Sequence, residues 1–221
     1  MKLVFYGGGD DQDNKKLDKE FFKIINTSNP LFTFIPASSY DSDLEFVEFV
    51  KQYKRFGITD FLHFPVDREF DSTLYETLFH SKVIHLHGGN TYYFLNTLKR
   101  SGIYNFLQEF VSQGGILTGL SAGAIIMSPC INTAGFPSFD KDENEDKIRN
   151  LKGLDLVRFE FFPHYRNSQR YDREILSYSK KTNNPIYACP DGNGIIVESD
   201  TIKFVDKCYM FKKGKKYLIS P

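Results

Sequence analysis

Short apolar runs alternate with stretches of helical periodicity along most of this 221-residue chain. Runs that favour strands lie at Lys2 to Tyr6, Leu31 to Pro36, Phe61 to Val66, Val83 to Leu86 and just before Gly119. Between them, apolar residues recur at helical spacing in residues 17–25, 46–56, 94–98 and 103–111, with a shorter helical piece near 73–79. This alternation predicts an α/β fold with a mostly parallel sheet, covered by helices on both faces.

The pattern also predicts how some of these elements begin and how the chain continues. Ser42 with Glu45 three residues later indicates a capping box at a helix start. From Ile186 onward, short β-rich runs separated by turn residues predict a β-rich extension of antiparallel strands at one end of the sheet. Pro137 to Asn150 is rich in Asp, Glu and Lys, which favours a flexible, solvated loop or surface helix. One domain over residues 1–221 accommodates all these elements.

Composition narrows the possible partners. Lys and Arg total 28 against 28 Asp and Glu, so no electrostatic footprint for nucleic acid or an anionic membrane is expected, and the ligand should be a small molecule. The chain opens on a strand without a basic, apolar leader, and no apolar run is long enough to span a bilayer. Three cysteines without C-x-x-C spacing suit a reducing compartment, so we expect a cytoplasmic protein, whose oligomeric state the sequence leaves open.

One stretch carries a chemical signal of its own. Residues 119–123 read Gly-Leu-Ser-Ala-Gly, which is a G-x-S-x-G motif between an apolar strand and small, apolar helix formers. A strand that turns sharply into a helix crowds the turning residue, and the glycines on either side of Ser121 make room for it. An ordinary tight turn would produce the same motif, so the choice depends on whether the chain also supplies a base.

A serine hydroxyl becomes a good nucleophile when an imidazole accepts its proton and a carboxylate orients that imidazole. His164 follows the apolar run Phe161 to Pro163 and so lies at a strand edge, where it is either a base or a hydrogen-bonding loop histidine. His85 and His87 lie two apart on a strand and point to one side, as two metal ligands would. No third ligand is evident, so neither a metal nor another cofactor is expected. We expect His63 and His80 to be structural or surface residues.

The chain resembles the peptidase E family of serine peptidases, which includes the cyanophycinases. Four motifs carry the resemblance in the same order, at residues 88–91 (Gly-Gly-Asn-Thr), 119–124, 163–164 (Pro-His) and 190–193 (Pro-Asp-Gly-Asn). The resemblance implies a flavodoxin-like fold related to class I glutamine amidotransferases. It also implies that Ser121 is the nucleophile, His164 the general base and Asp191 the residue that orients the histidine.

Two positions depart from the family pattern. The family's third residue is a glutamate within Pro-x-Gly-Asn, whereas Asp191 is one methylene shorter, so the backbone there must lie closer to the histidine. The family also carries a Thr-Asn-Asp stretch near its substrate pocket, and residues 132–136 (Asn-Thr-Ala-Gly-Phe) lack that acid. The second departure leaves the substrate specificity open.

Further site residues follow from the chemistry of acyl transfer and from the resemblance. The residue after an elbow nucleophile supplies one backbone N–H to the oxyanion, which here is Ala122, and Gly89 is expected to supply the second. Asn90 is expected to contact the substrate or, as an N-cap, to begin the next helix. An arginine suits a substrate carboxylate because its planar fork forms two parallel hydrogen bonds, and we expect Arg170, or failing that Arg166, in this role.

The sequence therefore favours a serine peptidase that cleaves short peptides through an acyl-enzyme, with an N-terminal aspartate as one expected substrate feature. A catalytically silent relative that binds a small amino-acid-like ligand is the alternative from another class. A glutamine amidotransferase is disfavoured because that chemistry uses cysteine, whereas position 121 is serine and Cys130 lies nine residues further on.

Overall fold

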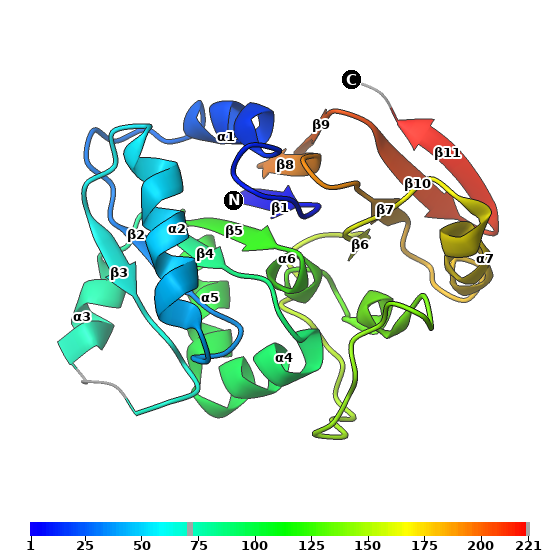
Figure 1. Ribbon diagram of the computed structural model, residues 1–221, viewed down its shortest axis with the longest axis horizontal. Coiled ribbons are helices and arrows are strands. Elements are labelled where there is room, and N and C mark those ends of the chain that lie inside the picture. The colour runs from blue at the N-terminus through cyan, green and yellow to red at the C-terminus, as the bar shows by residue number, and fades with distance from the viewer. Residues whose placement is uncertain (70–72, 220–221) are drawn as a thin grey trace.

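The computed structural model describes residues 1–69 and 73–219 of the chain, whose elements Figure 1 labels. The strands and helices up to Ser121 are β1 (Lys2–Tyr6), α1 (Lys15–Phe22), β2 (Phe32–Ile35), α2 (Ser42–Lys54), β3 (Phe61–His63), α3 (Thr73–Phe79), β4 (Val83–Leu86), α4 (Thr91–Arg100), α5 (Ile103–Ser112) and β5 (Ile116–Leu120). They are followed by α6 (Ala122–Ile126), the 3₁₀ helix η1 (Asn132–Gly135), β6 (Glu160–Phe162), α7 (Gln169–Tyr178), β7 (Ile186–Ala188), β8 (Gly194–Glu198), β9 (Thr201–Val205), β10 (Cys208–Lys212) and β11 (Lys215–Ile219).

A seven-stranded sheet with the order β3-β2-β4-β5-β1-β8-β9 forms the centre of the fold. The first five of these strands pair in parallel, whereas β8 and β9 join antiparallel at the β1 side. In this register Leu120 at the end of β5 lies opposite Tyr6 at the end of β1. The carboxyl ends of β1, β4 and β5 therefore meet at one edge, which is where open α/β sheets bind ligands.

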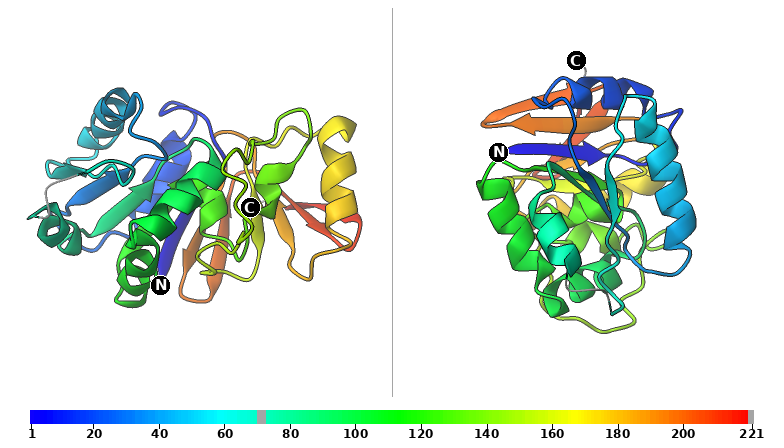
Figure 2. Two further views of the ribbon diagram at one scale, coloured as in Figure 1. Left: turned by 90° about the horizontal axis from the view of Figure 1, so that it is seen from below. Right: turned by 90° about the vertical axis from the view of Figure 1, so that its left-hand side faces the viewer.

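Both faces of the sheet are buried along β1, β2, β4 and β5, as these near-continuous apolar strands predict. Leu3 and Phe5 of β1 pack into a cluster with α4, α5 and α6, whereas Val4 and Tyr6 pack on the other face against α1 and α2. The alternation follows from the two-residue period of a strand. Figure 2 shows the two groups of helices on opposite sides of the sheet. The predicted α/β class is confirmed.

The C-terminal strands differ in part from the prediction. β8 and β9 extend the main sheet as expected, but β7, β10 and β11 join β6 in a second sheet with the order β11-β10-β7-β6. This sheet has its own apolar cluster, which includes Phe162, Ile186 and Phe211 and packs against Tyr171 and Ile175 of α7. It lies with α7 at the end of the molecule where the chain terminates (Figure 1). The pairing between distant segments has no signature in the local pattern, which shows only that each segment is a strand.

Two local predictions are also corrected. The capping box at Ser42 is absent, because Ser42 is already the first helical residue and its hydroxyl donates to the carbonyl of Ser39 at 3.0 Å. The N-cap is Asp41, whose φ of 57° is left-handed and whose side chain makes no cap hydrogen bond. β3 ends at His63 rather than Val66. No helix among residues 1–69 and 73–219 is long and apolar enough to cross a membrane.

Candidate active site

Ser121 lies at a sharp bend between β5 and α6, with φ 51° and ψ −109°. Close contacts explain the glycines beside it: a Cβ at position 119 would lie 2.5 Å from the Ala124 nitrogen, and one at position 123 would lie 2.1 Å from the Leu86 carbonyl oxygen. The bend is held by the Ser121 N–H, which donates to the Tyr6 carbonyl at 3.2 Å. The motif is therefore a strained elbow rather than an ordinary turn.

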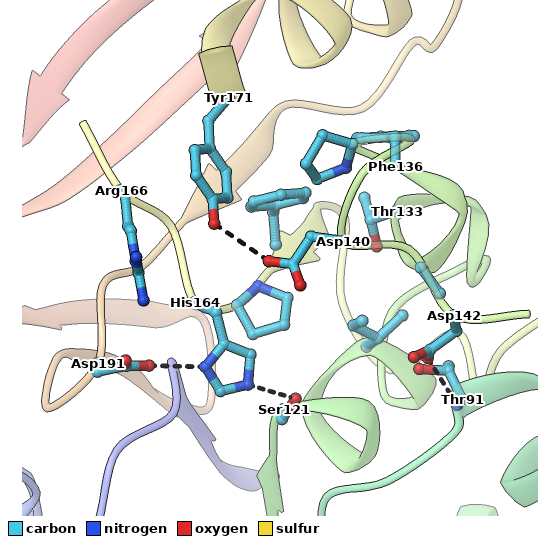
Figure 3. Close-up of a pocket in the computed structure, with 15 residues that line it drawn as sticks. Thr91, Ser121, Thr133, Phe136, Asp140, Asp142, His164, Arg166, Tyr171 and Asp191 are labelled. Atoms are coloured by element: carbon cyan, nitrogen blue, oxygen red, sulfur yellow. Dashed lines mark hydrogen bonds and ion pairs between the residues drawn. The ribbon is translucent and has the colours of Figure 1, made fainter. Parts of the chain in front are cut away.

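His164 and Asp191 come to Ser121 from the second sheet. His164 follows β6 and Asp191 follows β7, and these two strands pair in parallel, so both residues leave the same edge. His164 Nε2 lies 2.8 Å from Ser121 Oγ, and His164 Nδ1 lies 2.7 Å from Asp191 Oδ1 (Figure 3). With the Nδ1 proton donated to the carboxylate, Nε2 is free to accept the serine proton. The side chains of His164 and Asp191 are each 48% exposed, so a ligand can reach them.

The glycines after β1 form the surface against which this pair rests. A Cβ at Gly8, whose φ is +129°, would lie 2.2 Å from Asp191 Oδ1 and 2.3 Å from His164 Nδ1. The loop is tied to both partners, because the His164 N–H donates to the Gly7 carbonyl at 2.6 Å and the Gly192 N–H donates to the Gly8 carbonyl at 3.1 Å. The sequence analysis did not identify this glycine run as part of the site. Its position at the end of a central strand was the available signal.

Of the two expected oxyanion donors, Ala122 directly follows Ser121 and Gly89 belongs to a turn that approaches it. Ala122 begins α6 and is buried. Gly89 lies in the turn between β4 and α4, where an added Cβ would meet the Ala37 Cβ at 2.6 Å, and a Cβ at neighbouring Gly88 would lie 3.6 Å from the Ser121 Cβ. This turn therefore approaches the serine closely, as a second backbone donor requires.

Ser121, His164 and Asp191 open into a pocket of about 380 Å³. Its other lining residues come from α4, α6, η1, β6, α7 and the loops between them, and are Thr91, Ile125, Thr133, Ala134, Phe136, Pro137, Asp140, Asp142, Phe162, Pro163, Arg166 and Tyr171. The pocket therefore combines apolar surface with carboxylates, hydroxyls and one arginine, a composition typical of sites for small polar ligands.

Two of the three expected substrate contacts, Asn90 and Arg170, lie outside the pocket lining. Asn90 caps α4, because its Oδ1 accepts from the Tyr93 N–H at 2.9 Å while its Nδ2 donates to the Glu143 carbonyl at 2.9 Å. The Arg170 guanidinium carbon lies 3.5 Å from the centroid of the Phe139 ring. Neither residue lines the pocket, whereas Arg166 does. Arg166 is therefore the better candidate to contact a carboxylate of the substrate, which reverses the expected order of the two arginines. The guanidinium of Arg170 instead stacks on the Phe139 ring.

The acidic segment 137–150 is not simply a solvated loop or surface helix. Asp142 accepts a hydrogen bond from the Thr91 N–H at the start of α4 at 2.8 Å, and Asp140 accepts one from the Tyr171 hydroxyl at 3.1 Å. Asp146 binds the Asn96 amide at 2.9 Å. Carboxylates suit the first turn of a helix because its N–H groups are unpaired there, so this segment is tied across α4 and forms one wall of the pocket.

The remaining histidines do not contact Ser121. His85 is buried, with Nδ1 2.8 Å from Thr118 Oγ1 and Nε2 3.3 Å from His87 Nδ1. Burial lowers the pKa of His85 and lowers that of His87 to about 4. His63 pairs with Asp43, and His80 binds its own helix at the Glu76 carbonyl. Within the described ranges, no three His, Cys, Asp or Glu side chains gather as metal ligands.

Comparison with known proteins gives a consistent assignment. The model of peptidase family S51 matches residues 3–205. An uncharacterized peptidase of Listeria innocua, Lin0382, is 33% identical over 64% of this chain and 68% of its own length, and peptidase E of Shewanella sp. strain W3-18-1 is 27% identical over 61% and 58%. The solved structure of a candidate peptidase E protein from Listeria monocytogenes EGD-e has the same fold, with a TM-score of 0.74 and 23% identity over 92% of this chain and 97% of that one. The chain therefore belongs to peptidase family S51.

Proposed function

We propose that this chain is a serine peptidase that hydrolyses short peptides through an acyl-enzyme on Ser121. The observation that carries the proposal is the continuous line of hydrogen bonds from Ser121 through His164 to Asp191, at a strained elbow that opens into a pocket. Membership of a peptidase family supports the same reaction class.

In the proposed mechanism, Ser121 Oγ attacks the scissile carbonyl while His164 Nε2 accepts its proton. The backbone N–H groups of Ala122 and Gly89 stabilise the charge that develops on the carbonyl oxygen. Protonated His164, oriented by Asp191, then donates its proton to the leaving amine. Water, deprotonated by His164, hydrolyses the resulting ester and restores the serine.

The preference for an N-terminal aspartate receives less support than the reaction itself. Arg166 is the one arginine or lysine among the described residues that line the pocket, and Asp140 and Asp142 line it too. Asp140 and Asp142 would repel a carboxylate of the substrate, whereas Arg166 suits one.

The proposal is tested by labelling the purified protein with a fluorophosphonate probe and by assaying a panel of dipeptides. We expect labelling and turnover in the wild type and in Ser112→Ala, which removes an exposed helical hydroxyl. Ser121→Ala should abolish labelling and lower turnover by about 10⁴-fold or more. A protein that binds peptides but neither labels nor hydrolyses them would instead be the catalytically silent relative.

A further inference from the structure

Two buried hydroxyls in the pocket have no hydrogen-bond partner. Thr91 is 0% and Thr133 is 1% exposed, and the Oγ1 atom of each is unpaired among the residues that the structure describes. Buried polar atoms of folded proteins are almost always paired. Both residues line the pocket, so a polar group of a ligand bound at this wall would supply the partner that each hydroxyl lacks.

Two carboxylates lie along the same wall. Asp142 uses Oδ2 to accept the Thr91 N–H at 2.8 Å, and Asp140 uses Oδ2 to accept the Tyr171 hydroxyl at 3.1 Å. Each carboxylate has further acceptor capacity, because its two oxygens offer about four lone-pair directions. The wall therefore presents acceptors and negative charge.

The two sides of the pocket differ in charge. Figure 3 shows Asp142 and Thr91 on one side of Ser121, and His164 and Arg166 on the other, with Asp140 between them beside Tyr171. Asp191 also lies on the second side, where it accepts from His164, so Arg166 is the free positive group there. Under the proposed function, His164 protonates the leaving amine, so the leaving residue lies on the histidine side. The residue that supplies the acyl group then lies against Thr91, Thr133 and Asp142.

We propose that the wall formed by Thr91, Thr133 and Asp142 binds an ammonium group carried by the acyl residue of the substrate. This inference rests on the proposed function for the direction of the peptide. An ammonium has three N–H donors, which match the carboxylate and the two threonine hydroxyls. Arg166 on the opposite side suits the free carboxylate of the leaving residue, so the pocket selects a short peptide with its positive end at Asp142.

The same charges argue against an aspartyl side chain at this wall. The threonine hydroxyls alone could donate to a carboxylate, but Asp142 and Asp140 would repel it. Among the described lining residues, Arg166 is the one lysine or arginine, and it lies beyond His164. An acidic acyl residue is therefore expected to be a poor substrate.

The test measures kcat and KM for dipeptides that differ in one group and share leucine as the leaving residue. The comparison of Ala-Leu with N-acetyl-Ala-Leu reports on the α-ammonium. The comparison of N-acetyl-Lys-Leu with N-acetyl-norleucyl-Leu reports on a side-chain ammonium. The comparison of Asn-Leu with Asp-Leu reports on the penalty for an acidic side chain. Asp142→Asn removes the charge while keeping an acceptor for Thr91. Asp146→Asn is the matched control, because Asp146 belongs to the same segment but binds Asn96 outside the pocket.

We expect at least one of the two ammonium substrates to be favoured about 10-fold or more, through KM, and Asn-Leu to be favoured over Asp-Leu. Asp142→Asn should remove most of the ammonium preference, Thr133→Val should reduce it, and Asp146→Asn should leave it unchanged. The inference is overturned if neither ammonium is favoured, if Asp-Leu exceeds Asn-Leu, or if Asp142→Asn has no more effect than Asp146→Asn.

Calorimetric binding of the same peptides to Ser121→Ala protein separates this inference from the proposed function, because binding needs no turnover. A preference for ammonium that depends on Asp142, in a protein whose Ser121 does not react with the probe, would support the ammonium site and refute the peptidase. Labelling of Ser121 by the probe without any preference for ammonium would support the peptidase and refute the ammonium site.

Discussion

Replacing Gly8 by alanine should disable the site although none of the three proposed catalytic residues is substituted. The added Cβ would lie 2.2 Å from Asp191 Oδ1 and 2.3 Å from His164 Cε1 and Nδ1. Carbon and oxygen atoms in contact are normally more than about 3 Å apart, so the carboxylate and the imidazole must each move by about 1 Å. Such a movement breaks the 2.7 Å hydrogen bond between them.

The expected loss follows from what that hydrogen bond does in the proposed mechanism. A misplacement of about 1 Å costs about 10²-fold, and loss of the correct histidine tautomer costs about 10⁴-fold. Gly8→Ala should therefore lower kcat/KM by 10²- to 10⁴-fold, or about 3–5 kcal/mol of transition-state stabilisation. The φ of +129° adds a backbone cost of about 1–3 kcal/mol to folding.

The assay combines dipeptide turnover, labelling of Ser121 by a fluorophosphonate, and thermal unfolding. Gly57→Ala is the control, because Gly57 also has a positive φ, of +85°, yet an added Cβ there meets nothing within 4 Å. It should lose stability but keep its activity. The double variant Gly8→Ala/Asp191→Asn should be no worse than the poorer single variant, since both act on one pair. A folded Gly8→Ala protein with wild-type turnover, or equal losses in Gly57→Ala, would refute the reasoning.

Three further predictions concern single residues. Asp191→Asn should preserve the fold, as judged by circular dichroism, but lower kcat by about 10³- to 10⁴-fold, because His164 would then favour the wrong tautomer; unchanged kcat would exclude Asp191 from the mechanism. Arg166→Met should raise KM about 10-fold for a dipeptide with a free carboxylate and less for its amide, consistent with loss of a charge-assisted hydrogen bond worth ~1.5–3 kcal/mol. Arg170→Met should change neither KM appreciably, and the opposite ranking of the two variants would contradict the assignment. Burial raises the pKa of the Asp18 carboxyl from 3.8 to about 6. Between these pH values the folded state holds a proton that the unfolded state has released. The resulting contribution to stability is present below pH 4 and is lost as the pH rises through 6. Urea unfolding at pH 4 and pH 8 tests this. The free energy of unfolding of Asp18→Asn, relative to that of the wild type, should be about 2–3 kcal/mol more favourable at pH 8 than at pH 4. The same difference between the two proteins at both pH values would show that Asp18 is not the group responsible.

Much of the central sheet could be predicted from local sequence alone. β1, β2, β4 and β5 are short apolar runs, and the helices between them have apolar residues at helical spacing, because each element buries a face that its own residues define. The sharp bend at Ser121 was also readable, since the glycines at 119 and 123 reflect contacts within a few residues of the turn and with the adjacent strand. The motif alone did not distinguish a catalytic elbow from an ordinary turn.

The candidate site was only partly accessible in this way. His164 lay at a predicted strand edge, but its link to Ser121 and Asp191 came from resemblance, because the three residues lie 43 and 27 positions apart and local pattern carries no information on which strand ends meet. The parallel pairing of β6 with β7 brings His164 and Asp191 to one edge, and the loop after β1 positions them.

Tertiary structure alone decided which charges face the pocket. Asp140 and Asp142 looked like members of a solvated charged run, and Arg170 looked more suitable than Arg166. Exposed charged residues fit many loop paths at similar cost in water, so the sequence does not specify their direction. Apolar periodicity determined the layers of this protein, because burial of apolar surface is the largest favourable term in folding. The chemistry of the pocket wall was determined instead by the path of segment 137–150 across α4.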